Sequence, residues 1–94
     1  MVSEKVMVTN PSGLHLRPAG LLCNESIKFK SHISIQKNGS ISSAKSVLSI
    51  LGACVKNGDE ITIVCEGEDE EEALAHIVQL IRSGLGENRQ GETV

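Results

Sequence analysis

Apolar and polar residues alternate along three stretches of the chain, at residues 5–9, 32–37 and 60–66. A period of two is typical of a strand with one buried face, so each stretch is predicted to be a strand. A fourth, shorter strand is predicted at residues 40–42, because Asn38 and Gly39 tolerate the positive φ angles of a two-residue hairpin turn. The side chains expected to face the core from the first and last of these strands are Val6, Val8, Ile61, Ile63 and Cys65.

Apolar residues recur with helical spacing in two longer stretches. The first begins at about residues 16–18, where Pro18 suits the first helical turn, and runs to about Lys28. The second begins near Asp69 with four consecutive acidic residues, which suit the positive end of a helix dipole, and ends at Gly84. This acidic run is interpreted as a helix start rather than a metal site, because no second cluster of ligands accompanies it.

A shorter helix is predicted at residues 44–52, with Ser46 as its N-cap and Gly52 as its stop. The apolar residues of its central part are Val47, Leu48, Ile50 and Leu51. A helix that rests on a core needs only one apolar strip, so some of these side chains are expected to face outward and to bind a partner. The alternative is a helix buried on two sides.

These elements follow one another in the order β-α-β-β-α-β-α. The order predicts an α+β fold with a four-stranded antiparallel sheet and three helices on one face. Residues 1–94 are expected to form a single domain, with a mobile tail from about residue 87 because periodicity ends there.

Composition excludes several classes of function. Phe29 is the only aromatic residue, the formal net charge is -3, and no basic stripe is present, which argues against nucleic-acid binding. No apolar run approaches the length of a membrane span, so a cytoplasmic monomer is expected. The three cysteines are predicted to be small buried thiols rather than a thiol enzyme's nucleophile, His32 and His76 are predicted to be solvated, and no metal or cofactor is expected.

The segment from residue 13 to residue 19 carries the candidate chemistry. It places His15 at the start of the first helix, next to free backbone N–H groups and two residues from Arg17. Free amides, the positive end of the helix dipole and a guanidinium all favour a dianion at this place. We therefore interpret His15 as a carrier of a phosphoryl group; the alternative is a histidine that serves only as a helix cap.

The order Gly13-Leu14-His15-Leu16-Arg17-Pro18-Ala19 resembles the phosphorylation site of HPr, the histidine-containing phosphocarrier of the phosphoenolpyruvate-dependent sugar phosphotransferase system. The resemblance runs from about residue 5 to residue 87. It implies an open-faced β-sandwich and a carrier rather than an enzyme, with Nδ1 of His15 as the reacting nitrogen and Arg17 beside it. It also implies phospho-enzyme I as the donor and sugar-specific enzyme IIA proteins or domains as the acceptors.

Two alternatives to the sugar-system carrier stay open. One is a specialised or nitrogen-branch HPr-like carrier that uses a different enzyme I. The other is a regulatory binding module that is not phosphorylated, although a paralogue without the carrier role would be expected to lack His15. Leu16 stands where alanine is commoner in the family, and position 20 is Gly20, so partner preference is open as well.

Ser46 has two interpretations. It suits a plain N-cap, which needs no further role. The segment around it also resembles the site at which HPr of low-GC Gram-positive bacteria is phosphorylated by HPr kinase/phosphorylase, and the phosphoserine form in that family binds a catabolite control repressor. A phosphate there would add negative charge beside the surface where phospho-enzyme I docks. The residues predicted to form that docking surface are Leu16, Gly20, Val47, Leu48 and Leu51.

Overall fold

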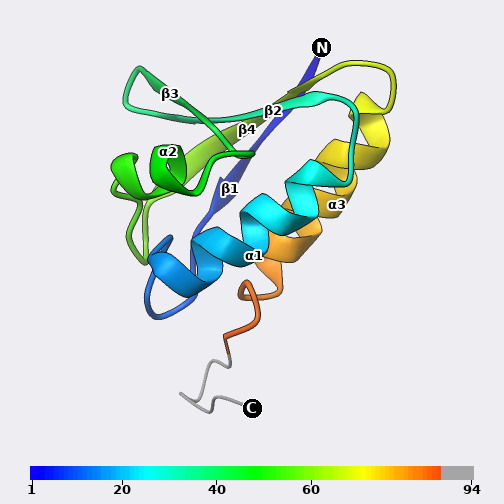
Figure 1. The fold of residues 1–94 in the computed structure, drawn as a ribbon. Coiled ribbons are helices and arrows are strands. Elements are labelled where there is room, and N and C mark those ends of the chain that lie inside the picture. The colour runs from blue at the N-terminus through cyan, green and yellow to red at the C-terminus, as the bar shows by residue number, and fades with distance from the viewer. Residues whose placement is uncertain (88–94) are drawn as a thin grey trace.

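A computed structural model describes residues 1–87, and it shows one sheet with its helices on a single face (Figure 1). The strands are β1 (Val2–Met7), β2 (His32–Lys37), β3 (Ser40–Ser43) and β4 (Glu60–Glu66). The helices are α1 (Leu16–Ile27), α2 (Val47–Gly52) and α3 (Glu70–Arg82). The predicted α+β fold, an open-faced sandwich in the order β-α-β-β-α-β-α, is confirmed.

The sheet has the strand order β1-β4-β2-β3, and every neighbouring pair is antiparallel. Its register sets Val6 opposite Ile61, and Ile35 opposite Ile63, so that apolar side chains from neighbouring strands meet on the face that the helices cover. The predicted inward-facing residues of β1 and β4, together with Val8, are all buried. Helix α1 contributes Leu22 to this core, and α3 contributes further apolar side chains.

The first strand begins and ends earlier than the sequence pattern indicates. Its ladder with β4 stops at Met7, opposite Glu60. Val8 is still buried, but its N–H donates to the carbonyl of Asp59 and its carbonyl accepts from the N–H of Gly58. The apolar alternation therefore continues past the strand because the chain goes on packing against the turn that precedes β4.

The two tight connections were both predicted. The hairpin between β2 and β3 is confirmed, since Asn38 has φ 51° and Gly39 has φ 85°. The stop predicted at Gly52 is confirmed as well, because α2 ends at that residue, and the chain then turns through Cys54, which has φ 54°. Position 54 is the second residue after the helix, where a left-handed conformation closes many helices and glycine is the usual choice.

The end of the described chain is held in place. Glu87, at which a mobile tail was predicted to begin, accepts hydrogen bonds from Asn10 and Ser12, 75 or more positions away in sequence. Residues 88–94, the remainder of that predicted tail, lie outside the described residues. Within residues 1–87 no helix has the length and apolar character needed to cross a membrane.

Candidate functional site

His15 is the N-cap of α1. Its backbone is extended, with φ -80° and ψ -173°, and its Nδ1 accepts a hydrogen bond of 2.9 Å from the N–H of Leu16. A ring nitrogen that accepts a hydrogen bond carries its lone pair and no proton. The first turn of α1 contains no acidic residue, and His15 itself is exposed. No carboxylate of the first turn therefore offsets the positive end of this helix. That end faces solvent beside the unprotonated Nδ1 of His15.

The turn before His15 is fixed against the rest of the molecule. Gly13 has φ +61°, and a Cβ at that position would lie 2.5 Å from the carbonyl oxygen of Val55. The next residue, Leu14, donates its N–H to the same carbonyl at 2.9 Å. Asn10 is 1% exposed and donates from Nδ2 to the carbonyl of Gly13 at 2.7 Å. Only glycine allows this close approach, so Gly13 sets the position from which His15 projects.

Two shallow hollows meet at His15. One, of about 290 Å³, is lined by Ser12, His15, Leu16, Arg17, Pro18 and Glu87. The other, of about 390 Å³, is lined by Ser12, Leu14, His15, Leu51, Cys54, Val55 and Lys56. The structure thus brings the imidazole and the guanidinium predicted from sequence to one small depression. The second hollow joins His15 to the C-terminal end of α2.

Glu87 is a residue of this site that sequence reasoning missed. Its Oε1 accepts from Nδ2 of Asn10 at 2.9 Å and from the N–H of Ser12 at 3.1 Å, and its Oε2 accepts from Oγ of Ser12 at 2.7 Å. These bonds, from Asn10 first and then Ser12, lower the pKa of the Glu87 carboxyl, and the charge of Arg17 lowers it further. No local sequence signal links residues 75 positions apart, so this contact was beyond prediction.

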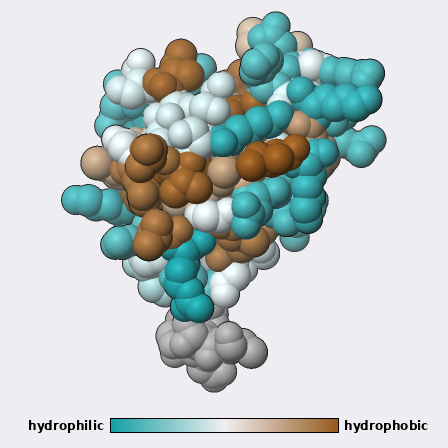
Figure 2. All heavy atoms as spheres, viewed as in Figure 1, coloured by the Kyte–Doolittle hydropathy of each residue, from teal (hydrophilic) through white to brown (hydrophobic). Residues whose placement is uncertain are grey.

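The predicted docking surface is only partly exposed. Leu48 and Leu16 are 81% and 61% exposed, whereas Val47 and Leu51 are half-buried against the core and Ile50 is fully buried. Hydrophobic side chains gather over α2 and the start of α1 in Figure 2. The alternative of an α2 buried on two sides is wrong, because Leu48 points away from the core. Gly20 is half-buried, and a Cβ there would meet no atom within 4 Å.

The family model described as the PTS HPr component phosphorylation site matches residues 2–83. The chain belongs to the HPr family. Among curated relatives, HPr-like protein Crh of Bacillus subtilis is 37% identical over 82 residues, covering 87% of this chain and 96% of Crh. Phosphocarrier protein HPr of Buchnera aphidicola is 43% identical, covering 82% of this chain and 91% of its own. The crystal structure of HPr-C-His from Thermoanaerobacter tengcongensis has a TM-score of 0.90 at 38% identity, covering 94% and 99% of the two chains.

In this member of the HPr family, Ser46 is the N-cap of α2, as predicted. Its Oγ accepts from the N–H of Ser49 at 3.2 Å, and its carbonyl accepts from the N–H of Ile50 at 3.0 Å. The side chain is half-buried at the edge of the surface that Leu48 exposes. The hydroxyl thus has a structural role in the unmodified protein.

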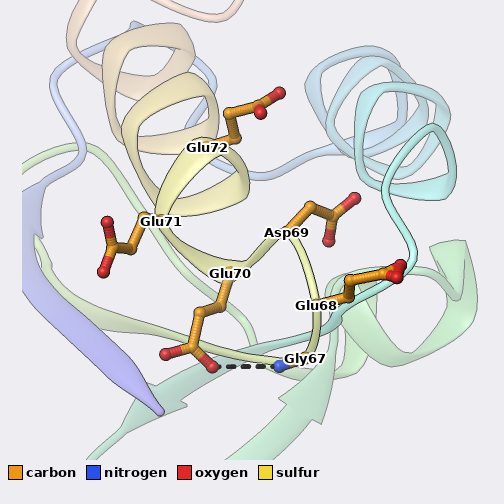
Figure 3. A pocket seen from close by; sticks show the side chains of 6 residues that line it. All are labelled: Gly67, Glu68, Asp69, Glu70, Glu71 and Glu72. Atoms are coloured by element: carbon orange, nitrogen blue, oxygen red, sulfur yellow. Dashed lines mark hydrogen bonds between the residues drawn. The ribbon is translucent and has the colours of Figure 1, made fainter.

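The acidic run at the start of α3 forms a separate hollow, lined by residues 67–72 (Figure 3). Its carboxylates point in different directions, and the Oε1 of Glu70 accepts from the N–H of Gly67 at 3.1 Å. Asp69 accepts from the N–H groups of Lys30 and Ser31 and from the Ser31 hydroxyl. The prediction of a helix start is confirmed, since α3 begins at Glu70. Within residues 1–87 no group of three or more His, Cys, Asp or Glu side chains is placed to hold a metal.

The remaining cysteines and histidines differ in their surroundings. Cys23 and Cys65 are buried as predicted, and burial raises the pKa of the Cys65 thiol to about 11. Cys54 is exposed, which contradicts the prediction, because the left-handed turn after α2 directs it to the surface. His32 and His76 are both exposed, as predicted, and Nε2 of His76 lies 2.7 Å from a carboxylate oxygen of Glu25 on α1.

Proposed function

We propose that His15 accepts a phosphoryl group on Nδ1 from phospho-enzyme I and passes it to sugar-specific enzyme IIA proteins or domains. The observation that carries this proposal is the hydrogen bond from the Leu16 N–H to Nδ1, at a helix N-terminus whose first turn holds no acid. It leaves the lone pair of the reacting nitrogen among groups that favour an anion.

In the forward step the Nδ1 lone pair attacks phosphorus. The bond between phosphorus and the donor's carrier atom breaks, its electron pair returns to the donor, and a bond between phosphorus and Nδ1 forms. Nε2 keeps its proton throughout, so the phosphorylated ring is cationic and its nitrogen can leave when an acceptor attacks the phosphorus. The N–H of Leu16 loses its acceptor and becomes available to a phosphoryl oxygen, and Arg17 supplies a guanidinium for the other oxygens.

The direct test is the intact mass of the protein after incubation with phosphoenolpyruvate, Mg²⁺ and a general enzyme I. We expect one added phosphoryl group that is lost in acid and absent from His15→Ala. His76→Ala is the matched control and should be phosphorylated as well as the wild type, since His76 lies in a contact with Glu25 rather than in the hollows beside His15. No addition with an enzyme I that is active on a control carrier would contradict the proposal.

Two alternatives within the HPr family remain. The relative Crh is named HPr-like rather than a phosphocarrier, so a regulatory binding module is one alternative; the presence of an exposed His15 with an unprotonated Nδ1 favours the carrier. A specialised or nitrogen-branch carrier would share His15 and Arg17. Uptake from a nitrogen-branch enzyme I and not from the general one would assign the chain to that branch.

We further propose that phosphorylation of Ser46 by an HPr kinase/phosphorylase slows transfer to His15, and that the phosphoserine form binds a catabolite control repressor. The hydroxyl lies at the edge of the apolar surface around Leu48, and the hollow shared by Leu51 and His15 connects α2 with the carrier site. A dianion at Ser46 would repel a phosphorylated donor that docks on this surface.

Ser46→Asp tests the charge effect. We expect the rate of His15 phosphorylation by enzyme I to fall by about tenfold at low ionic strength, and by less at high salt because screening weakens the repulsion. Ser40→Asp, on the exposed β2–β3 hairpin, adds the same charge elsewhere and should have little effect. Equal rates for Ser46→Asp and wild type, with an unchanged fold, would remove the regulatory role.

The carrier is proposed to act as a cytoplasmic monomer.

A further inference from the structure

The Glu87 carboxylate occupies hydrogen-bond donors that belong to the carrier site. Ser12 gives it both the backbone N–H and the hydroxyl, and Asn10 gives it the amide nitrogen. Asn10 is 1% exposed, and its Nδ2 donates both to the carbonyl of Gly13 and to Glu87, two acceptors that fix the orientation of this amide. The carboxylate is therefore held in place by three donors from the turn that leads to His15.

This negative charge lies in the wall of the depression that holds the imidazole. Glu87 lines the hollow of about 290 Å³ together with His15 and Arg17. A glutamate carboxyl is ionised at neutral pH, and the hydrogen bonds from Asn10 and Ser12, which lower the pKa of Glu87, favour the ionised form further. A phosphoryl group on Nδ1 would bring about two further negative charges into the same small space, at a distance where like charges repel.

We propose that Glu87 sets the phosphoryl-transfer potential of His15, by holding a fixed negative charge next to the phosphoryl group. This inference rests on the proposed carrier function. Repulsion between the carboxylate and the phosphoryl group raises the free energy of the phosphorylated protein relative to the unphosphorylated one. The phosphoryl group is consequently easier to pass to an acceptor, and the two anions compete for Arg17 and for the donors of Ser12.

Glu87→Gln separates the charge from the structural contact. The glutamine oxygen can still accept from Asn10 and from the Ser12 N–H, and its amide nitrogen can donate to the Ser12 oxygen, so the turn keeps its hydrogen bonds. The neutral side chain removes the repulsion. Glu71→Gln is the matched control, because Glu71 is exposed at the start of α3, at the other end of the molecule (Figures 1 and 3).

The experiment measures the ratio of phosphorylated to unphosphorylated full-length chain at equilibrium with enzyme I and a fixed ratio of phosphoenolpyruvate to pyruvate. For Glu87→Gln we expect this ratio to rise by about three- to tenfold, the size expected for one charge facing two across a hydrated hollow. Glu71→Gln should match the wild type. A purely structural role for Glu87 would leave the equilibrium of Glu87→Gln unchanged, because its hydrogen bonds persist.

An unchanged ratio in Glu87→Gln, with a phosphorylated wild type, overturns this inference and leaves the carrier function standing. A lower ratio also overturns it, since that would mean that the carboxylate stabilises the phosphorylated form. A wild type that takes up no phosphoryl group at all overturns the proposed function and this inference together. Hydrogen exchange of the Ser12 amide in each variant reports whether the turn has kept its hydrogen bond.

Discussion

The N-termini of α1 and α3 are preceded by similar sequence but differ in the charge of their first turns. In each, a glycine with positive φ stands two positions before the N-cap: Gly13 before His15 at α1, and Gly67 before Asp69 at α3. At α3 the first turn holds three glutamates, and Glu70 accepts from the N–H of Gly67. At α1 the first turn holds no acid, and the cap is an imidazole that uses only its Nδ1.

The difference lies in whether acidic side chains of the first turn already balance the positive end of the helix dipole. At α3 the chain's own glutamates balance the positive end of the dipole, and Glu70 binds the N–H of Gly67 just before the helix, so an external anion is disfavoured there. At α1 the carboxylate of Glu87 lines the same hollow as His15, but it binds the preceding turn rather than the helix. The positive end of α1, Arg17 and Nδ1 of His15 are the groups that we propose receive a phosphoryl group.

The largest expected effect is that of Gly13→Ala. The added Cβ would meet the Val55 carbonyl in a backbone conformation that alanine adopts reluctantly, so we expect the free energy of unfolding to fall by about 3 kcal/mol. Gly58→Ala is the matched control, since Gly58 has φ +96° but open space around a Cβ, and should cost only about 1 kcal/mol. Urea denaturation of both variants checks this; equal losses would show that the close approach at Gly13 carries no cost.

Arg17→Ala tests the charge at the open helix end. We expect phosphoryl transfer from enzyme I to slow by about 30-fold, with the urea midpoint nearly unchanged, because Arg17 is exposed and acts on the developing charge rather than on the core. Lys5→Ala removes an exposed cation from β1 and should leave the rate unaltered. Transfer that is as fast in Arg17→Ala as in wild type would mean that the backbone amides of α1 suffice.

A smaller effect is expected for Asp69→Asn, at the N-terminus of α3. The Ser31 hydroxyl and the Lys30 N–H, both donating to Asp69, lower its pKa to about 2 from an ordinary 3.8. The ionised form is thus favoured in the folded protein, so this contribution to stability is present above pH 4 and is lost as the pH falls towards 2. Asp69→Asn should be less stable than wild type at pH 7 and should lose less stability between pH 4 and pH 2, measured by urea denaturation. If wild type and Asp69→Asn lost the same stability between pH 4 and pH 2, Asp69 would not be the source of this pH dependence.

Most of the fold follows from periodicity. Alternation placed β2 and β4 at their observed residues, and helical spacing predicted a helix from about residues 16–18 to about Lys28, where α1 spans Leu16–Ile27. The Asn38-Gly39 turn was predicted because its residues tolerate positive φ at both positions. The apolar excess of α2 correctly predicted that part of it would be exposed. The core covers only one strip of the helix, and Leu48 lies outside that strip.

The features that sequence did not predict depend on tertiary contacts. α2 ends at Gly52 as predicted, but the left-handed residue that follows is Cys54 rather than a glycine, so residue preference does not indicate it. Asp69 accepts from the backbone of Lys30 and Ser31, 39 and 38 positions earlier in the chain, instead of capping α3. Glu87 reaches the carrier site across 75 positions. For the site, residue types predicted His15 and Arg17, whereas the carboxylate beside them was visible only in the fold.

The measurement that tests the central claim most directly is the nitrogen–phosphorus coupling pattern of the ¹⁵N-labelled protein after phosphorylation by enzyme I. If the open N-terminus of α1 is the carrier site, phosphorus couples to Nδ1 of His15, and the rings of His32 and His76 are unchanged. Coupling to Nε2 of His15, or to either of the other two histidines, would contradict the account.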